Sequence, residues 1–310
     1  MNWQLSDPSP ALLVHPPAVA SLDEAEAAID QWQWYSGKQL DSAQRLAVQL
    51  MLAENAAGRW AARTTGRAES RQNGKGDEIE VVEAWGLTQR NEAIVHTAHE
   101  IPTAKNAHLR LVAHLEGHAD LRRKIGKVRY ANGDQAIEMS GASGGVIVYR
   151  TRTAGGGRGL DDISRLGVDE AQHAQAEQLA SSTPILAANP NPQMNFTGSA
   201  GIAGRSDWWW QLRKRALLGG TGEFSWLEHS AEHVEINRDG RIISTSPDPT
   251  DREAWMRANP AYGTRIEPEF LAEQLATLGP DLFAREHLCV WDPYNDGEGG
   301  LIPRDTWSDL

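Results

Sequence analysis

The chain of 310 residues contains a single cysteine, Cys289, and no apolar run of the length that crosses a bilayer. One cysteine excludes an internal disulfide and any zinc site built from two or more thiolates. A membrane-spanning helix needs about 20 consecutive apolar residues, so we expect none here. The N-terminal residues are rich in proline and lack the basic start and apolar stretch of a signal peptide. These absences favour an intracellular globular protein.

Positive charge is also scarce, because the net charge is −12 and the sequence pI is near 5.3. This balance argues against a protein whose whole surface binds nucleic acid, but it leaves room for local basic patches. Two short stretches are candidates for such a basic patch. Each is either a site for DNA phosphates or a solvated helix face. They comprise Arg122, Arg123, Lys124, Lys127 and Arg129, and Arg213, Lys214 and Arg215.

Strand-like and helix-like segments alternate along the chain. Residues 92–98, 145–150 and 193–197 are rich in apolar and β-branched side chains, and a short apolar run at 166–168 ends at two acids. Residues 40–54 and 103–121 have helical apolar spacing, and residues 60–65 form only a weak strand candidate. The alternation predicts an α/β fold with a mostly parallel sheet covered by helices.

The first chemical motif is a polar loop that precedes a predicted helix starting near Asp77. It reads Arg71, Gln72, Asn73, Gly74, Lys75 and Gly76. A phosphate-binding loop needs inward N–H groups, a glycine for close approach and a lysine that reaches the β- and γ-phosphates. The standard pattern also has Gly at position 69 and Ser or Thr at position 76, where this chain has Glu69 and Gly76. The alternative is an ordinary polar turn before a helix.

The second motif is Asp169-Glu170, which follows the short apolar run. In an ATPase, an aspartate at the end of such a strand holds the Mg²⁺ shell, and the glutamate next to it activates the attacking water. The alternative is a solvated acidic pair that caps the following helix.

Further candidates are weaker when taken singly. Gln44 could contact an adenine or be an exposed helix residue, and Arg158, flanked by glycines, could act on a γ-phosphate in a neighbouring subunit or be a solvated or DNA-contacting arginine. Arg71 could contact the γ-phosphate from within the loop. The end of the 193–197 strand, at Thr197, Gly198 and Ser199, could couple hydrolysis to movement.

Together these motifs resemble the large subunit of tailed-phage terminase, the DNA-packaging motor. The loop beginning with Arg71-Gln72 is similar to the family's own variant phosphate loop. Further matching segments are His96 to Glu100, Gly157-Arg158-Gly159, Val168 to Gln172, Ala258 to Gly263 with Trp255, and Phe283, Arg285-Glu286 and Trp291.

The resemblance implies a P-loop NTPase core of the additional-strand type with a small lid subdomain. We therefore expect an N-terminal arm at 1–30, the ATPase core at 31–224, the lid at 225–290 and a linker at 291–310 toward a nuclease domain that is not in this chain. ATP and Mg²⁺ are the implied cofactors, with Glu170, Lys75, Arg71 and a trans-acting Arg158 as catalytic residues and Asp169 as the metal ligand. Gln44 and residues 71–77 would bind the nucleotide.

The resemblance also implies partners and a location. These are double-stranded DNA, a portal protein, the small terminase subunit and a ring of identical subunits, a pentamer, with a monomer as the alternative for the isolated domain. The host cytoplasm is the implied compartment. Two other functions stay open: a helicase-type DNA translocase, and a nucleotide-binding scaffold without hydrolysis, which the missing hydroxyl at Gly76 favours.

Overall fold

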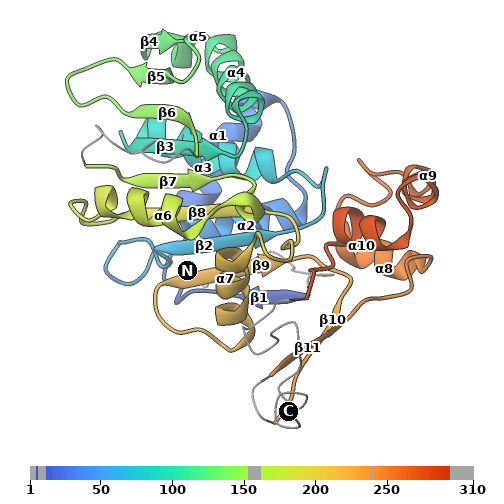
Figure 1. The fold of residues 1–310 in the computed structure, drawn as a ribbon. Coiled ribbons are helices and arrows are strands. Elements are labelled where there is room, and N and C mark those ends of the chain that lie inside the picture. Colours follow the sequence, from blue (N-terminus) through green and yellow to red (C-terminus); the bar gives the residue numbers. More distant parts are fainter. Residues whose placement is uncertain (1–4, 6–11, 153–161, 239–240, 294–310) are drawn as a thin grey trace.

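The computed structural model describes residue 5 and residues 12–152, 162–238 and 241–293. Its central feature is a mostly parallel sheet that crosses the molecule (Figure 1). Among the described residues its strand order is β1 (Leu13–His15), β9 (Phe224–Glu228), β2 (Thr64–Ala68), β8 (Gln193–Gly198), β7 (Arg165–Val168), β3 (Ala93–Ala98), β6 (Val146–Thr151), β5 (Gln135–Met139) and β4 (Ile125–Arg129).

The six strands from β9 to β6 are parallel to one another, and the outer strands β1, β5 and β4 pair antiparallel. Strand β8 lies between β2, which precedes the polar loop, and β7, which ends at the acidic pair. This inserted strand is the defining feature of the additional-strand NTPase core, so the expected fold class is confirmed.

Helices cover both faces of the sheet because successive residues of a strand point to opposite faces. Ile94 of β3 packs with one apolar cluster, while the next residue, Val95, packs with the other. The side on which Ile94 packs is covered by α1 (Asp23–Ser36), α2 (Ser42–Leu52), α3 (Lys75–Gln89), α4 (Ile101–Gly117) and α5 (Ala119–Arg122). After β7 and β8 come the 3₁₀ turn η1 (Ala171–His173), α6 (Ala176–Ser182), the 3₁₀ turn η2 (Thr183–Leu186) and α7 (Asp207–Leu217).

Three further helices form a separate small body beside the sheet (Figure 1). They are α8 (Arg252–Ala258), α9 (Pro268–Leu278) and α10 (Pro280–Leu288), and their apolar side chains make a core of their own around Trp255, Leu271 and Phe283. A two-stranded ribbon of β10 (His233–Ile236) and β11 (Ile242–Thr245) precedes them. We call these three helices and the segments that connect them, residues 252–288, the lid.

Three structural features lie near the expected domain boundaries. Strand β9 belongs to the main sheet, paired in parallel with β2, so the core continues past residue 224. Strand β1, within the expected arm, pairs with β9. Trp291, expected at the start of a linker, is 4% exposed and packs among the core tryptophans.

The weak strand candidate at residues 60–65 overlaps strand β2 only at Thr64 and Thr65. The rest of the β2 sequence, TTGRA, has glycine and arginine where apolar residues would normally be. Tertiary contacts explain both. A Cβ at Gly66 would lie 2.2 Å from the Trp226 ring, so only glycine lets that ring pack on the strand. Arg67 is buried between acidic partners.

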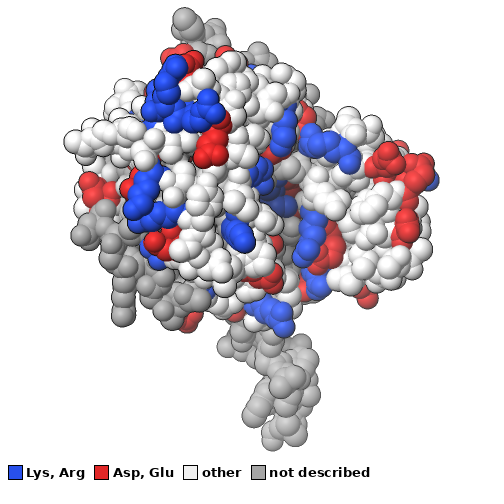
Figure 2. Space-filling model, turned by 90° about the horizontal axis from the view of Figure 1, so that it is seen from above, with Lys and Arg blue, Asp and Glu red and all other residues white. Residues whose placement is uncertain are grey.

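The two basic stretches predicted from the sequence do not form simple exposed helix faces. Lys127 and Arg129 lie on the edge strand β4, where Arg129 pairs with Asp134 and Glu138. Arg213 is fully buried and pairs with Glu228 and Glu232, so it is not a surface contact for DNA. Figure 2 shows the lysines and arginines of one face as separate groups with acidic side chains among them. No described helix is long and apolar enough to cross a bilayer.

Candidate active site

The carboxyl ends of β2, β8 and β7 meet at one edge of the sheet because these neighbouring strands are parallel. The polar loop follows β2, the acidic pair follows β7, and the Thr197-to-Ser199 segment ends β8 between them. Strands lie about 4.8 Å apart, so the two outer segments are separated by about 10 Å. The fold therefore brings the separate sequence motifs to one place.

The polar loop is shaped to bind an anion. Gln72 has φ 65° and Gly74 has φ 107°, and α3 begins directly afterwards at Lys75, two residues earlier than expected. Among the described residues, no backbone carbonyl accepts a hydrogen bond from the N–H groups of residues 72–76. Unpaired N–H groups at the start of a helix are the usual setting for a bound phosphate.

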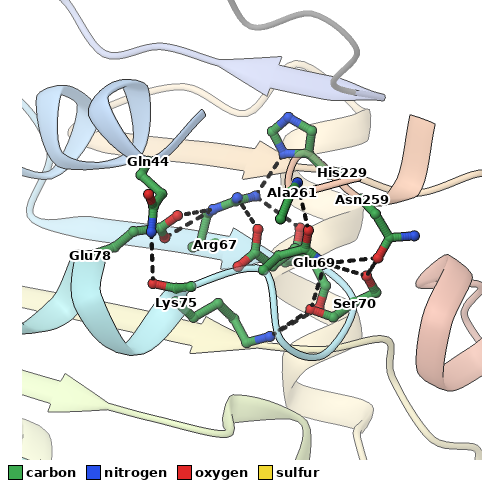
Figure 3. Close-up of polar contacts among 12 residues, drawn as sticks. Gln44, Arg67, Glu69, Ser70, Lys75, Glu78, His229, Asn259 and Ala261 are labelled. Atoms are coloured by element: carbon green, nitrogen blue, oxygen red, sulfur yellow. Dashed lines mark hydrogen bonds and ion pairs between the residues drawn. The ribbon is translucent and has the colours of Figure 1, made fainter. Parts of the chain in front are cut away.

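Lys75 extends from the loop toward the end of β8. Its ammonium donates to the carbonyl oxygens of Glu69 at 3.2 Å and Ser70 at 3.1 Å, and to the Ser199 hydroxyl at 3.4 Å. These partners hold the positive charge at the sheet edge (Figure 3).

The acidic residue Asp169 is fixed from β8. Its Oδ1 accepts hydrogen bonds from the Thr197 hydroxyl at 2.9 Å and from the Glu170 N–H at 2.9 Å. Its Oδ2 accepts none from the described residues. Thr197 thus contacts Asp169 while Ser199 contacts Lys75, so the end of β8 links the two sides of the site.

Glu170 has a left-handed backbone, with φ 53° and ψ 52°. Burial, and then the neighbouring Asp169, raises the pKa of its carboxyl, which suits a group that must accept a proton. The backbone strain is offset by Arg152, whose guanidinium donates to the carbonyl oxygens of Glu170 at 3.0 Å, Asp169 at 2.6 Å and Thr97 at 3.2 Å. Burial lowers the pKa of Arg152 to about 10, so it stays charged at neutral pH. No motif in the sequence indicated this residue.

Gln44 lies beside the polar loop, but its amide is already engaged. Its Nε2 donates to the Gly74 carbonyl at 3.4 Å, and its Oε1 accepts from the Asp41 N–H at 3.1 Å as part of a capping box on α2. The side chain is 2% exposed. In this structure Gln44 supports the loop, and an adenine contact would require the amide to turn.

The remaining loop residues contact the lid. Asn73 donates to the Asn259 side chain at 2.9 Å and accepts from the Ala261 N–H at 3.1 Å (Figure 3). Arg71 pairs with Glu286 of α10 at 2.5 Å. The lid is therefore bonded directly to the loop, and Asn259 belongs to the 258–263 segment that resembles the terminase pattern.

Glu69, which departs from the standard phosphate-loop pattern, has a structural partner. It is fully buried and forms an ion pair with Arg67, which also donates to Glu78 of α3 at 3.1 Å (Figure 3). Burial raises the pKa of Glu78 to about 8. Arg67 Nη1 also lies 2.9 Å from His229 Nδ1 at the end of β9. Sequence reasoning missed this buried cluster because its members come from three separate segments.

Two parts of the prediction, Arg158 and the metal ion, are not among the contacts given above. Arg158 lies in the stretch 153–161, outside the described residues. Among the described residues, no group of three or more histidine, cysteine or acidic side chains could hold a metal on its own. A metal at this site would need ligands from its substrate as well as from Asp169.

No sequence-family model and no curated protein matches this chain. Solved structures share its fold. The HK97 bacteriophage large terminase aligns with a TM-score of 0.71 and 17% identity over 92% of this chain and 58% of that one. The ATPase domain of the Thermus phage P74-26 large terminase gives 0.59 and 12% over 85% and 98%. A large terminase from a thermophilic bacteriophage, in complex with ADP, gives 0.50 and 12% over 78% and 54%.

The chain therefore has the fold of a large terminase ATPase domain. It spans a little over half the length of the HK97 large terminase with which it aligns, at 58%.

Proposed function

We propose that this chain is the ATP-hydrolysing motor domain of a viral terminase large subunit, which drives double-stranded DNA into a procapsid. One observation carries the proposal: unpaired N–H groups and the Lys75 ammonium share a sheet edge with the Asp169-Glu170 pair, on the fold of terminase ATPase domains.

The N–H groups of residues 72–76 and Lys75 would hold the β- and γ-phosphates of ATP. The loop's positive potential, at the start of a helix of 15 residues, favours a polyphosphate. Lys75 would exchange its present carbonyl partners for phosphate oxygens. Arg71 would reach the γ-phosphate only after leaving Glu286, so the lid controls its access.

Glu170 would orient the attacking water and take its proton as the water oxygen bonds to the γ-phosphorus. The bond from the γ-phosphorus to the β–γ bridging oxygen would break, so that ADP leaves. Its raised pKa and the fixed left-handed backbone support this role. Arg158, supplied by a neighbouring subunit, would stabilise the charge that develops on the phosphate.

The residues present fit a magnesium ion carried by the nucleotide. Mg²⁺ commonly keeps several waters and takes one or two carboxylates plus phosphate oxygens. Asp169 offers the free Oδ2, while Thr197 and the Glu170 N–H hold the other oxygen in place. When bound, the ion would neutralise charge on the phosphate oxygens.

The motor's partners follow from the same proposal. We propose a ring of identical subunits, a pentamer, working with a portal protein, the small terminase subunit and duplex DNA in the host cytoplasm. Nuclease activity is not expected from this chain. The surface basic groups that remain, such as Lys124 and Lys127, are candidates for DNA phosphates.

Phosphate release, measured against protein concentration with and without duplex DNA, tests the proposal. Because Arg158 would act across a subunit interface, the rate per subunit should rise with concentration. Lys75→Ala should weaken ATP binding roughly ten- to a hundredfold. Glu170→Gln should keep ATP binding and lose about a hundredfold or more in turnover.

Unchanged ATP affinity in Lys75→Ala would contradict the phosphate-loop assignment. Tight nucleotide binding without phosphate release at any concentration would instead indicate the scaffold function. Strand separation driven by ATP would indicate the helicase-type translocase.

A further inference from the structure

The residue after Lys75 is Gly76, where phosphate loops usually have a hydroxyl side chain. The space beside Gly76 belongs to a residue from another helix, Arg110 of α4. A Cβ built at Gly76 would lie 3.3 Å from Arg110 Nη2 and 3.4 Å from Nη1. Arg110 Nη2 also donates to the Gly76 carbonyl at 2.8 Å. A guanidinium therefore lies directly beside the place where a Cβ at position 76 would stand, so a serine or threonine side chain there would crowd it.

The Arg110 side chain is held in this position by a buried acid. Its Nε donates to Glu80, one turn further along α3, which is 3% exposed. Glu80 also accepts from the Trp32 indole at 3.2 Å and contacts His114 Nδ1 at 2.5 Å. With Glu80 fixed from three sides, the guanidinium has little freedom to leave the start of α3.

Part of the guanidinium remains available to a ligand. Nη1 donates to none of the described residues, and the Arg110 side chain is 35% exposed. The negative charge of Glu80 raises the pKa of Arg110 against the effect of its burial, so the group stays charged. The guanidinium lies beside the first turn of α3, and this turn directly follows the loop with the unpaired N–H groups.

We propose that Arg110 binds a phosphate group of the nucleotide. Its fixed guanidinium takes over part of the role that a loop hydroxyl and its metal ion have in other phosphate loops. Arg110 Nη1 donates to a phosphate oxygen on the Gly76 side of the loop. The inference rests on the proposed function, because it assumes that a nucleoside triphosphate binds at this loop. It follows that ATP binding by this chain depends only weakly on Mg²⁺.

The test is the affinity for a fluorescent ATP analogue, measured with Mg²⁺ and again in EDTA. Arg110→Met keeps the apolar stem and removes the charge, and it should weaken binding in EDTA about tenfold or more. Arg110→Lys should recover part of that loss, and Lys105→Met, an exposed change on the same helix, should leave affinity within about twofold. A change below threefold for Arg110→Met in EDTA, in a variant that folds, would overturn the proposal.

Gly76→Ser provides an independent test that keeps the arginine. The new Cβ crowds the guanidinium, so binding in EDTA should weaken while binding with Mg²⁺ is kept or improved. Combining it with Arg110→Met should cost less than the two single losses multiplied, because both act on one contact. Independent, multiplicative effects would contradict the proposal.

The two proposals fail in different ways. If Lys75→Ala keeps full affinity, the loop does not bind nucleotide and the proposed function fails. If Lys75→Ala loses affinity while Arg110→Met does not, only the role of Arg110 is wrong.

Discussion

The Thr197 hydroxyl donates to Asp169 Oδ1 at 2.9 Å, across the boundary between β8 and β7. Thr197 itself is fully buried. Two residues further along, the Ser199 hydroxyl accepts from the Lys75 ammonium at 3.4 Å. One short segment therefore contacts both the proposed metal ligand and the proposed phosphate-binding lysine. We therefore expect the end of β8 to respond to a change in either group.

Replacing Thr197 by valine should separate binding from turnover. Valine has nearly the same shape but cannot donate, so Asp169 would lose the bond that orients Oδ1. We expect ATP affinity to change by less than about threefold and phosphate release to fall about tenfold or more. Steady-state phosphate release and equilibrium nucleotide binding measure the two quantities. Thr197→Ser, which keeps the hydroxyl, should retain most of the turnover, and equal losses in both variants would rule out this role.

Replacing Arg152 by methionine should disturb the acidic pair without touching the phosphate loop. Three carbonyl oxygens, those of Thr97, Asp169 and Glu170, would lose their donor. We expect a loss of about 1–3 kcal/mol in the free energy of unfolding and a larger fall in turnover than in ATP affinity. Denaturant unfolding and phosphate release are the measurements.

Arg150→Met is the matched control, since Arg150 lies on β6, two residues before Arg152, and donates to one exposed carbonyl, that of Gly133 at 3.1 Å. If Arg150→Met lost as much turnover as Arg152→Met, the effect would not be specific to the acidic pair.

Replacing Gly66 by alanine should destabilise the protein. The added methyl would lie 2.2 Å from the Trp226 ring, which is itself fully buried and cannot move without repacking the core. Overpacking of this kind costs about 1–3 kcal/mol. Gly117→Ala on α4 is the control, because a Cβ there meets nothing within 4 Å. Denaturant midpoints should fall for the first variant and not for the second.

The buried Glu78 should make stability depend on pH. Its folded pKa is raised to about 8 from an ordinary value of 4.5, so between these values the folded chain binds more protons than the unfolded chain. Stability from this group is therefore fully present below pH 4.5 and is lost as the pH rises through about 8, by at most about 1.4 kcal/mol per pH unit.

Glu78→Gln should remove that slope. The measurement is the free energy of unfolding in urea at several pH values, taken as the difference between the variant and the parent. Burial lowers the pKa of His229, which gives a slope of opposite sign, but this slope is present in both proteins and cancels in the difference. Glu273→Gln, an exposed change on α9, should leave the slope as it is in the parent. If the free energy of unfolding of Glu78→Gln changed with pH in parallel with that of the parent, Glu78 would not be the source of this slope.

Local pattern was enough to predict a good part of the fold. The apolar, β-branched runs at β3, β6 and β8 and the capped helix α2 were expected near their observed limits, because each carries its signal in consecutive residues. The strands β2, β4 and β5 were missed or left weak. The composition of β2 is set by tertiary partners, as Gly66 and Arg67 show, and no local rule contains those partners.

The sequence by itself determined the α/β fold class and the negative net charge, and it predicted candidate site residues at the ends of β2, β7 and β8. Each of these follows from residue type and spacing along the chain. Only the tertiary structure decided that Arg152 supports Glu170, that Arg110 stands beside Gly76 and that Asn259 ties the lid to the loop. These contacts join residues far apart in the chain, and such partners are chosen by the packing of helices against a twisted sheet.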